Sequence, residues 1–211
     1  MISLYYAPGN ASLLPHMMLR EAGVPFELRL VDRERNAQRG ESYLRLNPSG
    51  RIPVLVDGDL VLFETAAIAF HLVDRFPQAR LAPPPGARDR AHFYRWMIHL
   101  TNTPQVEFRA WFYPSEHVTD AACAGSVKTA AGQRLDRMFD VISGQLGDRP
   151  WLLGDTFSAA DLFLFMLMRW SREMPRPART IPNLGDLANR VLERPAVRAA
   201  LEAEGLREPW C

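Results

Sequence analysis

The chain has 211 residues, of which 47% are hydrophobic and 23% charged, and its formal net charge is +1. This composition is typical of a globular protein that buries one or two sizeable cores, and the charge predicts no nucleic-acid partner. No apolar run approaches the ~20 residues of a membrane span, so no membrane association is expected. The apolar start, Met1–Tyr6, lacks a basic leader and predicts a strand instead of a signal peptide, with a cytoplasmic location as the default.

The first part of the chain alternates predicted strands and helices. The expected strands are 2–6, 26–31, 54–56 and 60–62, and the expected helices are 13–22 and 65–76. Gly23 is the predicted stop of the first helix, and Asp57-Gly58 is the turn between the last two strands. With a short irregular or helical piece before that hairpin, the order is thioredoxin-like.

A proline stands directly before the third predicted strand. Inside a sheet Pro53 would remove a ladder donor, so it belongs at the strand's first position or in a turn that accommodates a cis bond. Such a turn presents the backbone of Ile52 to a ligand. At the start of the next helix, Glu64-Thr65 lies beside free amide groups that attract a carboxylate, and the acid itself can take an ammonium.

The second part of the chain shows only helical periodicity. Three prolines in series at Pro83–Pro85 predict an extended connector before it. The expected helices are 89–111, 121–146, 159–172 and 184–204, with a bend near Pro104. We therefore expect a thioredoxin-like domain at 1–78, a proline-rich linker at 79–88 and an all-helical bundle domain at 89–211, in an α/β plus all-α architecture.

The helix predicted from Ala159 has a strong start signal. Ser158 and Asp161 form a capping box, in which each side chain bonds the backbone of the other residue. Asp161 also precedes the very apolar run 162–168, which makes a catalytic acid the alternative. A capping carboxylate is the favoured interpretation.

The Ile52-Pro53-Val54-Leu55 and Glu64-Thr65-Ala66-Ala67-Ile68 patterns, at this spacing, resemble the glutathione transferases. The resemblance implies that Ile52, before a cis Pro53, pairs its backbone with the cysteinyl part of glutathione. It also implies that Glu64 and Thr65 hold the γ-glutamyl end. The family's helical domain has a similar capping box, and its members are dimers, so we expect a homodimer with glutathione as co-substrate.

The resemblance covers nearly the whole chain and is closest to the bacterial beta class. The segments 5–13, 151–155 and 193–197 are similar to that class. One difference matters most: where the class has a cysteine in the loop before the first helix, this chain has Ala11. Exchange of the glutaredoxin type needs a protein thiolate and is therefore disfavoured.

Three other side chains are candidates for the donor to the glutathione sulfur. They are Tyr6, Asn10 and Ser12, and the alternatives are a packing role for Tyr6 and a helix cap for Ser12. A thiol pKa of ~8.5 leaves little thiolate at neutral pH, and lowering it by one unit needs ~1.4 kcal/mol of preferential stabilisation. The sequence leaves the choice among the three open.

The rest of the expected site is less sharply defined. Arg51, or one of Arg33, Arg35 and Arg39, is expected at the glycyl carboxylate, with solvated arginines as the alternative. The electrophile pocket is expected between the domains. Its candidate residues are Pro8, Asn10, Phe108, Trp111 and Phe112, and a core or dimer-interface role for these aromatics is the alternative.

The five histidines and two cysteines do not suggest a metal site or a disulfide. Beta-class relatives have a histidine in the helix that faces the active site, and the matching region here carries Gln105. Cys123 and Cys211 are expected to be incidental.

Together these features predict a detoxifying glutathione transferase that adds the glutathione thiolate to small hydrophobic electrophiles. The alternatives are a glutathione-dependent isomerase or dehalogenase, and a non-catalytic glutathione-binding carrier or interaction protein.

Overall fold

The computed structural model describes residues 1–208 and 210, so the expectation for Cys211 lies outside the described part of the chain. The chain folds into two compact units. The first combines Met1–Pro84 with Leu192–Trp210, and the second is Pro85–Val191. The predicted domain boundaries at 78 and 88 stay predictions, but the inclusion of 192–210 in the first unit is a feature that the sequence did not indicate.

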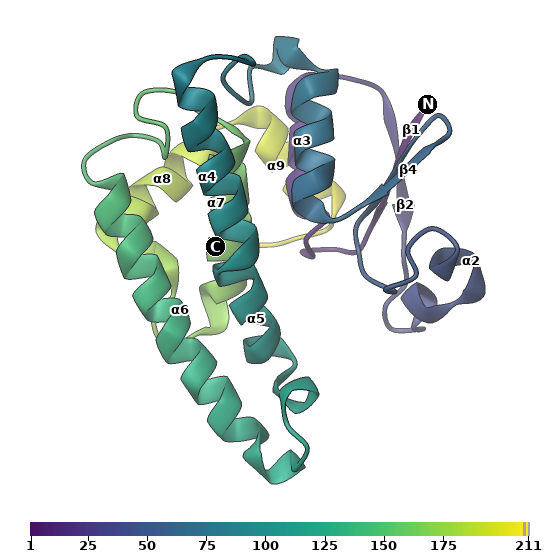
Figure 1. The fold of residues 1–211 in the computed structure, drawn as a ribbon, viewed down its shortest axis with the longest axis vertical. Coiled ribbons are helices and arrows are strands. Elements are labelled where there is room, and N and C mark those ends of the chain that lie inside the picture. The colour runs from purple at the N-terminus through teal and green to yellow at the C-terminus, as the bar shows by residue number, and fades with distance from the viewer. Residues whose placement is uncertain (209, 211) are drawn as a thin grey trace. The chain divides into compact units, whose positions relative to one another are not determined.

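The first unit contains a four-stranded mixed sheet with the strand order β2-β1-β3-β4 (Figure 1). Its strands are β1 (Ile2–Tyr6), β2 (Phe26–Leu30), β3 (Val54–Asp57) and β4 (Leu60–Phe63). β1 pairs in parallel with β2 and antiparallel with β3, and β3 pairs antiparallel with β4. The four predicted strands are confirmed to within one residue at each end.

Helices pack on one face of this sheet. α1 (Leu13–Ala22) and α3 (Thr65–Arg75) contact the sheet and each other, and α9 (Pro195–Ala203) packs against α1. Leu4 and Leu55 are paired across β1 and β3 and are fully buried. Gly23 ends α1 with φ 64°, a left-handed conformation that glycine adopts without a steric cost.

The other face of the sheet is covered by the segment between β2 and β3. This segment contains the 3₁₀ helix η1 (Ala37–Arg39) and the short α2 (Glu41–Leu44). Tyr43 of α2 packs with Val31 and Val54 in a small buried cluster, to which Tyr5 and Ile52 add partly buried side chains. The segment therefore lies against the residues that lead into β3.

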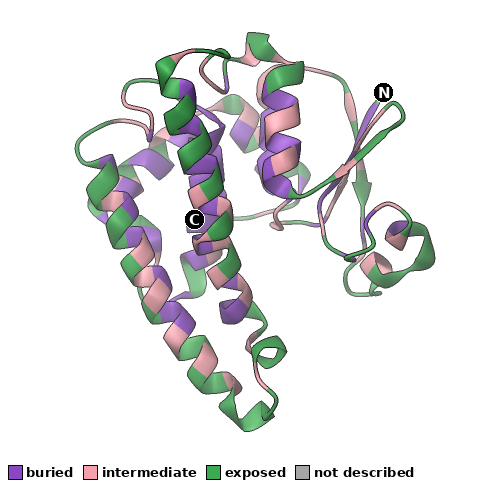
Figure 2. Ribbon diagram, in the orientation of Figure 1, coloured by how far each residue is buried: buried purple, intermediate pink, exposed green. Residues whose placement is uncertain are grey.

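The described part of the second unit is built mainly from α-helices, which short 3₁₀ helices connect. Its α-helices are α4 (Arg88–Asn102), α5 (Pro104–Phe112), α6 (Ala124–Leu146), α7 (Ala159–Trp170) and the greater part of α8 (Pro182–Leu192). The short 3₁₀ helices of the chain outside η1 are η2 (Pro77–Ala79), η3 (Pro114–His117), η4 (Ala121–Cys123), η5 (Ser171–Glu173) and η6 (Ala178–Thr180). α6 alternates buried and exposed residues, whereas α7 is buried from Ala159 to Arg169 (Figure 2).

Prolines divide two of the predicted helices. The expected bend near Pro104 is a complete break between α4 and α5, and Pro104 occupies the first position of α5. The single helix predicted at 184–204 is wrong, because α8 ends at Leu192 and Pro195 begins α9. Proline lacks the N–H that would continue a helix, but it is tolerated in the first turn.

The predicted capping box at the start of α7 is confirmed. The carboxylate of Asp161 accepts hydrogen bonds from the backbone N–H of Ser158 at 2.8 Å and of Leu152 at 2.8 Å. The hydroxyl of Ser158 donates to the same carboxylate at 3.1 Å and accepts from the N–H of Ala160 at 3.3 Å. Both side chains are fully buried, so each polar group at this helix start has a partner within the protein.

Candidate functional site

The sheet register brings the three predicted ligand-binding segments to the same end of the sheet. Tyr5 of β1 pairs with Val54 of β3, and Val54 pairs with Phe63 of β4. The residues that continue from these positions are the loop after Tyr6, the Ile52-Pro53 turn and Glu64. The pairing of neighbouring strands therefore places these segments side by side.

The Ile52-Pro53 peptide bond is cis, as the position of the proline before β3 suggested. Pro53 is buried, Ile52 is half-buried and Arg51 is exposed. Within the described part of the chain, no hydrogen bond engages the backbone N–H or carbonyl of Ile52. This turn therefore leaves backbone groups available to a ligand beside the sheet.

Glu64 has an unusual backbone at the start of α3. Its φ of 73° and ψ of 117° lie in a region that costs a residue with a side chain about 1–3 kcal/mol. The Glu64 side chain makes no capping hydrogen bond and is exposed, while Thr65 is buried. This helix start can therefore offer both its first amide groups and a carboxylate to a ligand that carries a carboxylate and an ammonium.

Ser12 immediately precedes α1, but its hydroxyl points into the protein. The side chain is fully buried, donates to the carbonyl of Ala7 at 3.2 Å and accepts from the N–H of Ala7 at 3.3 Å. It makes no capping hydrogen bond to α1. Because its one donor is in use, Ser12 would have to release the Ala7 carbonyl before it could donate to another acceptor.

Asn10 lies in the same loop and is only half-buried. Its Oδ1 accepts a hydrogen bond from Nη1 of Arg33 at 3.2 Å, and its Nδ2 donates to the carbonyl of Pro8 at 3.3 Å. The amide nitrogen carries a second N–H, so Asn10 retains a donor beyond the bond to Pro8. Pro8 itself is exposed.

Tyr6 ends β1 near the buried side chain of Glu204. Burial, and after it the negative charge of Glu204, raise the pKa of the Tyr6 phenol above its usual value. The phenol therefore keeps its proton at neutral pH. Its ring lies 6.4 Å from the ring of His16, between centroids, in a tilted arrangement.

Glu204, which directly follows α9, contacts Gly9 in the loop before α1 and His16 of α1. Its Oε1 lies 2.9 Å from Nδ1 of His16, and its Oε2 accepts from the N–H of Gly9 at 2.8 Å. The side chains of His16 and Glu204 are fully buried. Sequence reasoning did not find this cluster, because a separation of 188 residues carries no local signal.

The candidate arginines have different surroundings. Arg35 lies beside Asp32, with 3.5 Å between Nε and Oδ2, but its side chain is 88% exposed. Arg39 approaches Gly50, where its Nη1 would lie 3.1 Å from an added Cβ, and Arg51 is exposed. Arg33 reaches the loop before α1, where its Nη1 donates to Oδ1 of Asn10.

The aromatic residues that are candidates for the electrophile pocket differ in how far they are buried within the second unit. Phe108 and Trp111 are buried, whereas Phe112 is 42% exposed. The ring of Trp170, at the end of α7, stands perpendicular to that of Phe112 at 6.2 Å between centroids. Tyr113, beside it, is 36% exposed. Phe112, Tyr113 and Trp170 thus form an aromatic surface, and the sequence interpretation had not included Trp170.

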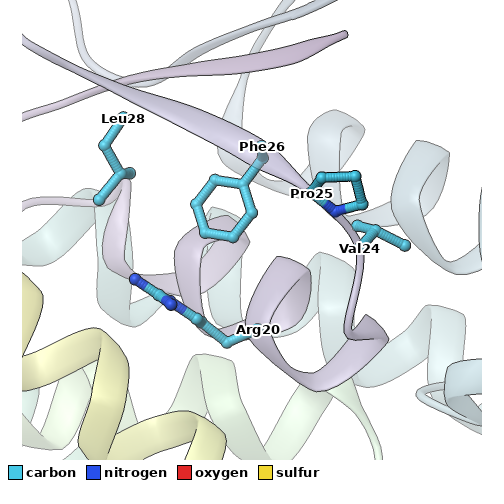
Figure 3. A pocket seen from close by; sticks show the side chains of 5 residues that line it. All are labelled: Arg20, Val24, Pro25, Phe26 and Leu28. Atoms are coloured by element: carbon cyan, nitrogen blue, oxygen red, sulfur yellow. The ribbon is translucent and has the colours of Figure 1, made fainter.

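A shallow cavity of about 290 Å³ lies in the first unit between α1 and β2. Arg20, Val24, Pro25, Phe26 and Leu28 line it, and Figure 3 shows the Arg20 side chain across from the Phe26 ring. None of the predicted ligand-binding residues is among them. The guanidinium carbon of Arg20 lies 5.3 Å from the centre of the Phe26 ring.

Within 1–208 and 210, no three or more His, Cys, Asp and Glu side chains form a group that could hold a metal ion. No helix in this part of the chain has the length and apolar character needed to cross a membrane. The expectation that no metal takes part stays a prediction, as does the inertness of the exposed Cys123.

The chain therefore combines two kinds of domain: a thioredoxin-like sheet with a cis-proline turn, and then a group of helices with a buried capping box. The family model described as glutathione S-transferase, N-terminal domain, matches residues 2–74. That described as glutathione S-transferase, C-terminal domain, matches residues 106–203. The chain belongs to the glutathione S-transferase family, whose members are transferases.

Individual relatives agree over almost the full length. Glutathione S-transferase GST-4.5 of Xanthomonas campestris pv. campestris is 33% identical over 205 residues, which are 97% of this chain and 100% of that protein. The beta-class glutathione S-transferase of Sphingomonas chungbukensis is 33% identical, with a TM-score of 0.85 over 97% of this chain and 100% of that chain. A sphingomonad glutathione S-transferase complexed with glutathione is 34% identical, with the same TM-score and coverage. The predicted fold and the resemblance to beta-class transferases are confirmed.

Proposed function

We propose that this protein binds glutathione at the end of the sheet formed by β1, β3 and β4, and adds its thiolate to small hydrophobic electrophiles. The observation that carries the proposal is the cis Ile52-Pro53 turn with an unengaged Ile52 backbone, next to the open start of α3. The related sphingomonad glutathione S-transferase is complexed with glutathione, which supports the same ligand here.

Each part of glutathione has a proposed partner. The backbone of Ile52, before Pro53, pairs with the cysteinyl part, while Glu64 takes the ammonium and Thr65 with the amides of α3 takes the carboxylate of the γ-glutamyl end. Arg51 is the proposed partner of the glycyl carboxylate, because its exposed guanidinium lies one residue before Ile52.

Asn10 is the proposed donor to the sulfur. Its half-buried amide retains an N–H, whereas the Ser12 hydroxyl is buried and already donates to the Ala7 carbonyl. Arg33 fixes the orientation of the Asn10 amide, because its Nη1 donates to Oδ1 and so leaves Nδ2 as the outward donor. A donor that bonds the thiolate more strongly than the thiol lowers the pKa of the thiol.

The acceptor is proposed to be a planar, apolar electrophile. Phe112, Tyr113 and Trp170 support this substrate class, because the exposed rings of the first two and the half-buried ring of Trp170 can pack against another flat ring. Phe108 would support this surface from beneath, because its buried ring contacts those of Phe112 and Trp170. Trp111, which packs against Gly132 of α6, stays a predicted pocket residue. Pro8 and Asn10 stay predicted acceptor-site residues.

Two further features belong to the proposal. We infer a homodimer, supported by exposed apolar side chains on the edge strand β4, where Leu60, Val61 and Phe63 are each about 40% exposed. Light scattering after size-exclusion chromatography tests it, and a monomer at micromolar concentration contradicts it. A detoxifying role in the cytoplasm follows from the proposed chemistry and from the sequence-based expectation.

A conjugation assay tests the proposed function. With 1-chloro-2,4-dinitrobenzene as the aromatic electrophile, the rate of conjugate formation should saturate with glutathione concentration and fall for Trp170→Ala. Binding of glutathione, measured by calorimetry, without conjugation of this or an α,β-unsaturated carbonyl acceptor would favour the carrier alternative. Absence of glutathione binding would contradict the proposal as a whole.

A further inference from the structure

The carbonyl of Arg51 is held by two buried side chains. The Tyr43 hydroxyl donates to this oxygen at 2.7 Å, and Nδ2 of Asn47 donates to it at 2.8 Å. Tyr43 is 5% exposed and Asn47 is 2% exposed, so neither donor has water as an easy alternative partner. The two hydrogen bonds occupy both lone pairs of the carbonyl oxygen.

This anchored carbonyl belongs to the same peptide group as the N–H of Ile52. A peptide group is planar, and in the trans form its C=O and N–H point in opposite directions. Because the carbonyl of Arg51 is directed at the Tyr43 and Asn47 side chains, the N–H of Ile52 must point away from them. That N–H has no hydrogen-bond partner among the described residues.

The two donors are themselves firmly placed. Oδ1 of Asn47 accepts from the N–H of Ser49 at 3.1 Å and from its hydroxyl at 2.7 Å, which orients the amide with Nδ2 toward Arg51. The ring of Tyr43 packs edge-on against the ring of Tyr5, with 6.0 Å between centroids. Burial, with a smaller effect of Tyr5, raises the pKa of the Tyr43 phenol well above its usual value, so it remains a donor.

We propose that Tyr43 and Asn47 are positioning residues for glutathione, which fix the Arg51–Ile52 peptide group so that its N–H is aimed at the cysteinyl part of the ligand. The inference rests on the proposed function. It adds that affinity depends on two side chains that do not touch the ligand. A rigid donor spares the ligand the entropy cost of ordering the turn when it binds.

Tyr43→Phe is the test, because phenylalanine retains the ring and removes only the hydroxyl donor. Tyr5→Phe is the matched control, since it removes a hydroxyl from the neighbouring ring, which makes no bond to Arg51. We expect Tyr43→Phe to weaken the calorimetric Kd for glutathione about three- to tenfold, and Tyr5→Phe to leave it within twofold. In the conjugation assay, Tyr43→Phe should raise the KM for glutathione and leave kcat unchanged.

A second variant and a second measurement distinguish a positioning role of these side chains from an effect on the overall stability of the protein. Asn47→Asp retains the acceptor for Ser49 but loses the donor, and should also weaken binding. The amide signal of Ile52 in ¹H–¹⁵N spectra should shift on adding glutathione to the wild type and Tyr5→Phe, and shift less in Tyr43→Phe.

The outcomes distinguish this inference from the proposed function. Tyr43→Phe and Asn47→Asp with lowered thermal stability but a wild-type Kd and Ile52 shift would overturn the positioning role and leave the glutathione site intact. A wild type that does not bind glutathione would overturn the proposed function, and the inference with it.

Discussion

The helices α3 and α7 each begin beside an acidic and a hydroxyl side chain, but the two starts are built differently. At α7, Ser158 and Asp161 are fully buried, and their polar groups bond one another and the nearby backbone. At α3, Glu64 is exposed and makes no capping bond, and its φ is 73°. A helix start with all its polar groups paired stabilises the fold, whereas one left open is available to a ligand.

The comparison predicts that changes at α7 affect stability alone and changes at α3 affect binding alone. The largest effect should follow from Asp161→Ala, which leaves two N–H groups and the Ser158 hydroxyl without their buried acceptor. We expect a loss of about 3 kcal/mol or more in the free energy of unfolding by urea. Asp186→Ala, at an exposed position of α8, should change it little. A loss below about 1 kcal/mol for Asp161→Ala would contradict the structural role.

Asp161 should also make stability depend on pH. Burial raises its pKa from 3.8 to about 6, against the opposing effect of its hydrogen bonds. Between these pH values the folded protein keeps a proton on Asp161 that the unfolded chain has lost. The stabilisation that this proton gives to the folded state is therefore full below pH 3.8 and is lost as the pH rises through about 6. The difference in unfolding free energy between wild type and Asp161→Asn should fall by about 2 kcal/mol from pH 4 to pH 7. A difference that rises over this range would contradict the assignment.

In contrast to the α7 variants, Glu64→Gln should weaken glutathione binding and leave the stability of the fold almost unchanged. Removing the charge that is proposed to meet the ligand ammonium should weaken the Kd for glutathione about 10- to 100-fold. Because the Glu64 side chain is exposed and makes no cap, the free energy of unfolding should stay within about 0.5 kcal/mol of wild type. Asp59→Asn, an exposed acid in the adjacent hairpin turn, is the control and should alter neither quantity.

Ser158→Ala should produce the smallest effect. Loss of the capping hydroxyl should lower the free energy of unfolding by ~1 kcal/mol and leave the Kd of the folded fraction unchanged. Ser126→Ala, on an exposed turn of α6, provides the comparison. A weakened Kd in Ser158→Ala would show that the two helix starts are not separate in function.

The features that local sequence predicts well are those with a short-range cause. The hairpin turn, the capping box at Ser158 and the proline before β3 each have a cause within a few residues, and the structure has all three. The turn lies at Gly58-Asp59, one residue after the predicted Asp57-Gly58, because Asp57 still pairs with Leu60. Hydrophobic periodicity located each long helix, but it could not detect the break at Pro195, because the apolar pattern continues across it.

The features that the sequence could not predict depend on tertiary contacts. The inward hydroxyl of Ser12 follows from its bonds to Ala7, and the cluster of Glu204 with His16 joins opposite ends of the chain. The burial of Phe108 beside an exposed Phe112 depends on neighbouring helices, since both are aromatic residues of the same helix. Local pattern therefore identified the candidate site but not the donor to the sulfur.

The most direct test of the whole account is an ultraviolet difference titration of bound glutathione against pH, which follows the absorbance of the thiolate. Wild type should show a saturable thiolate signal with a pKa well below the free value of ~8.5. Asn10→Ala should raise that pKa, while the folded fraction of Ser12→Ala should retain the wild-type value. A thiolate pKa that shifts with Ser12→Ala alone would contradict the assignment of Asn10, and binding without any thiolate would contradict the proposed transferase chemistry.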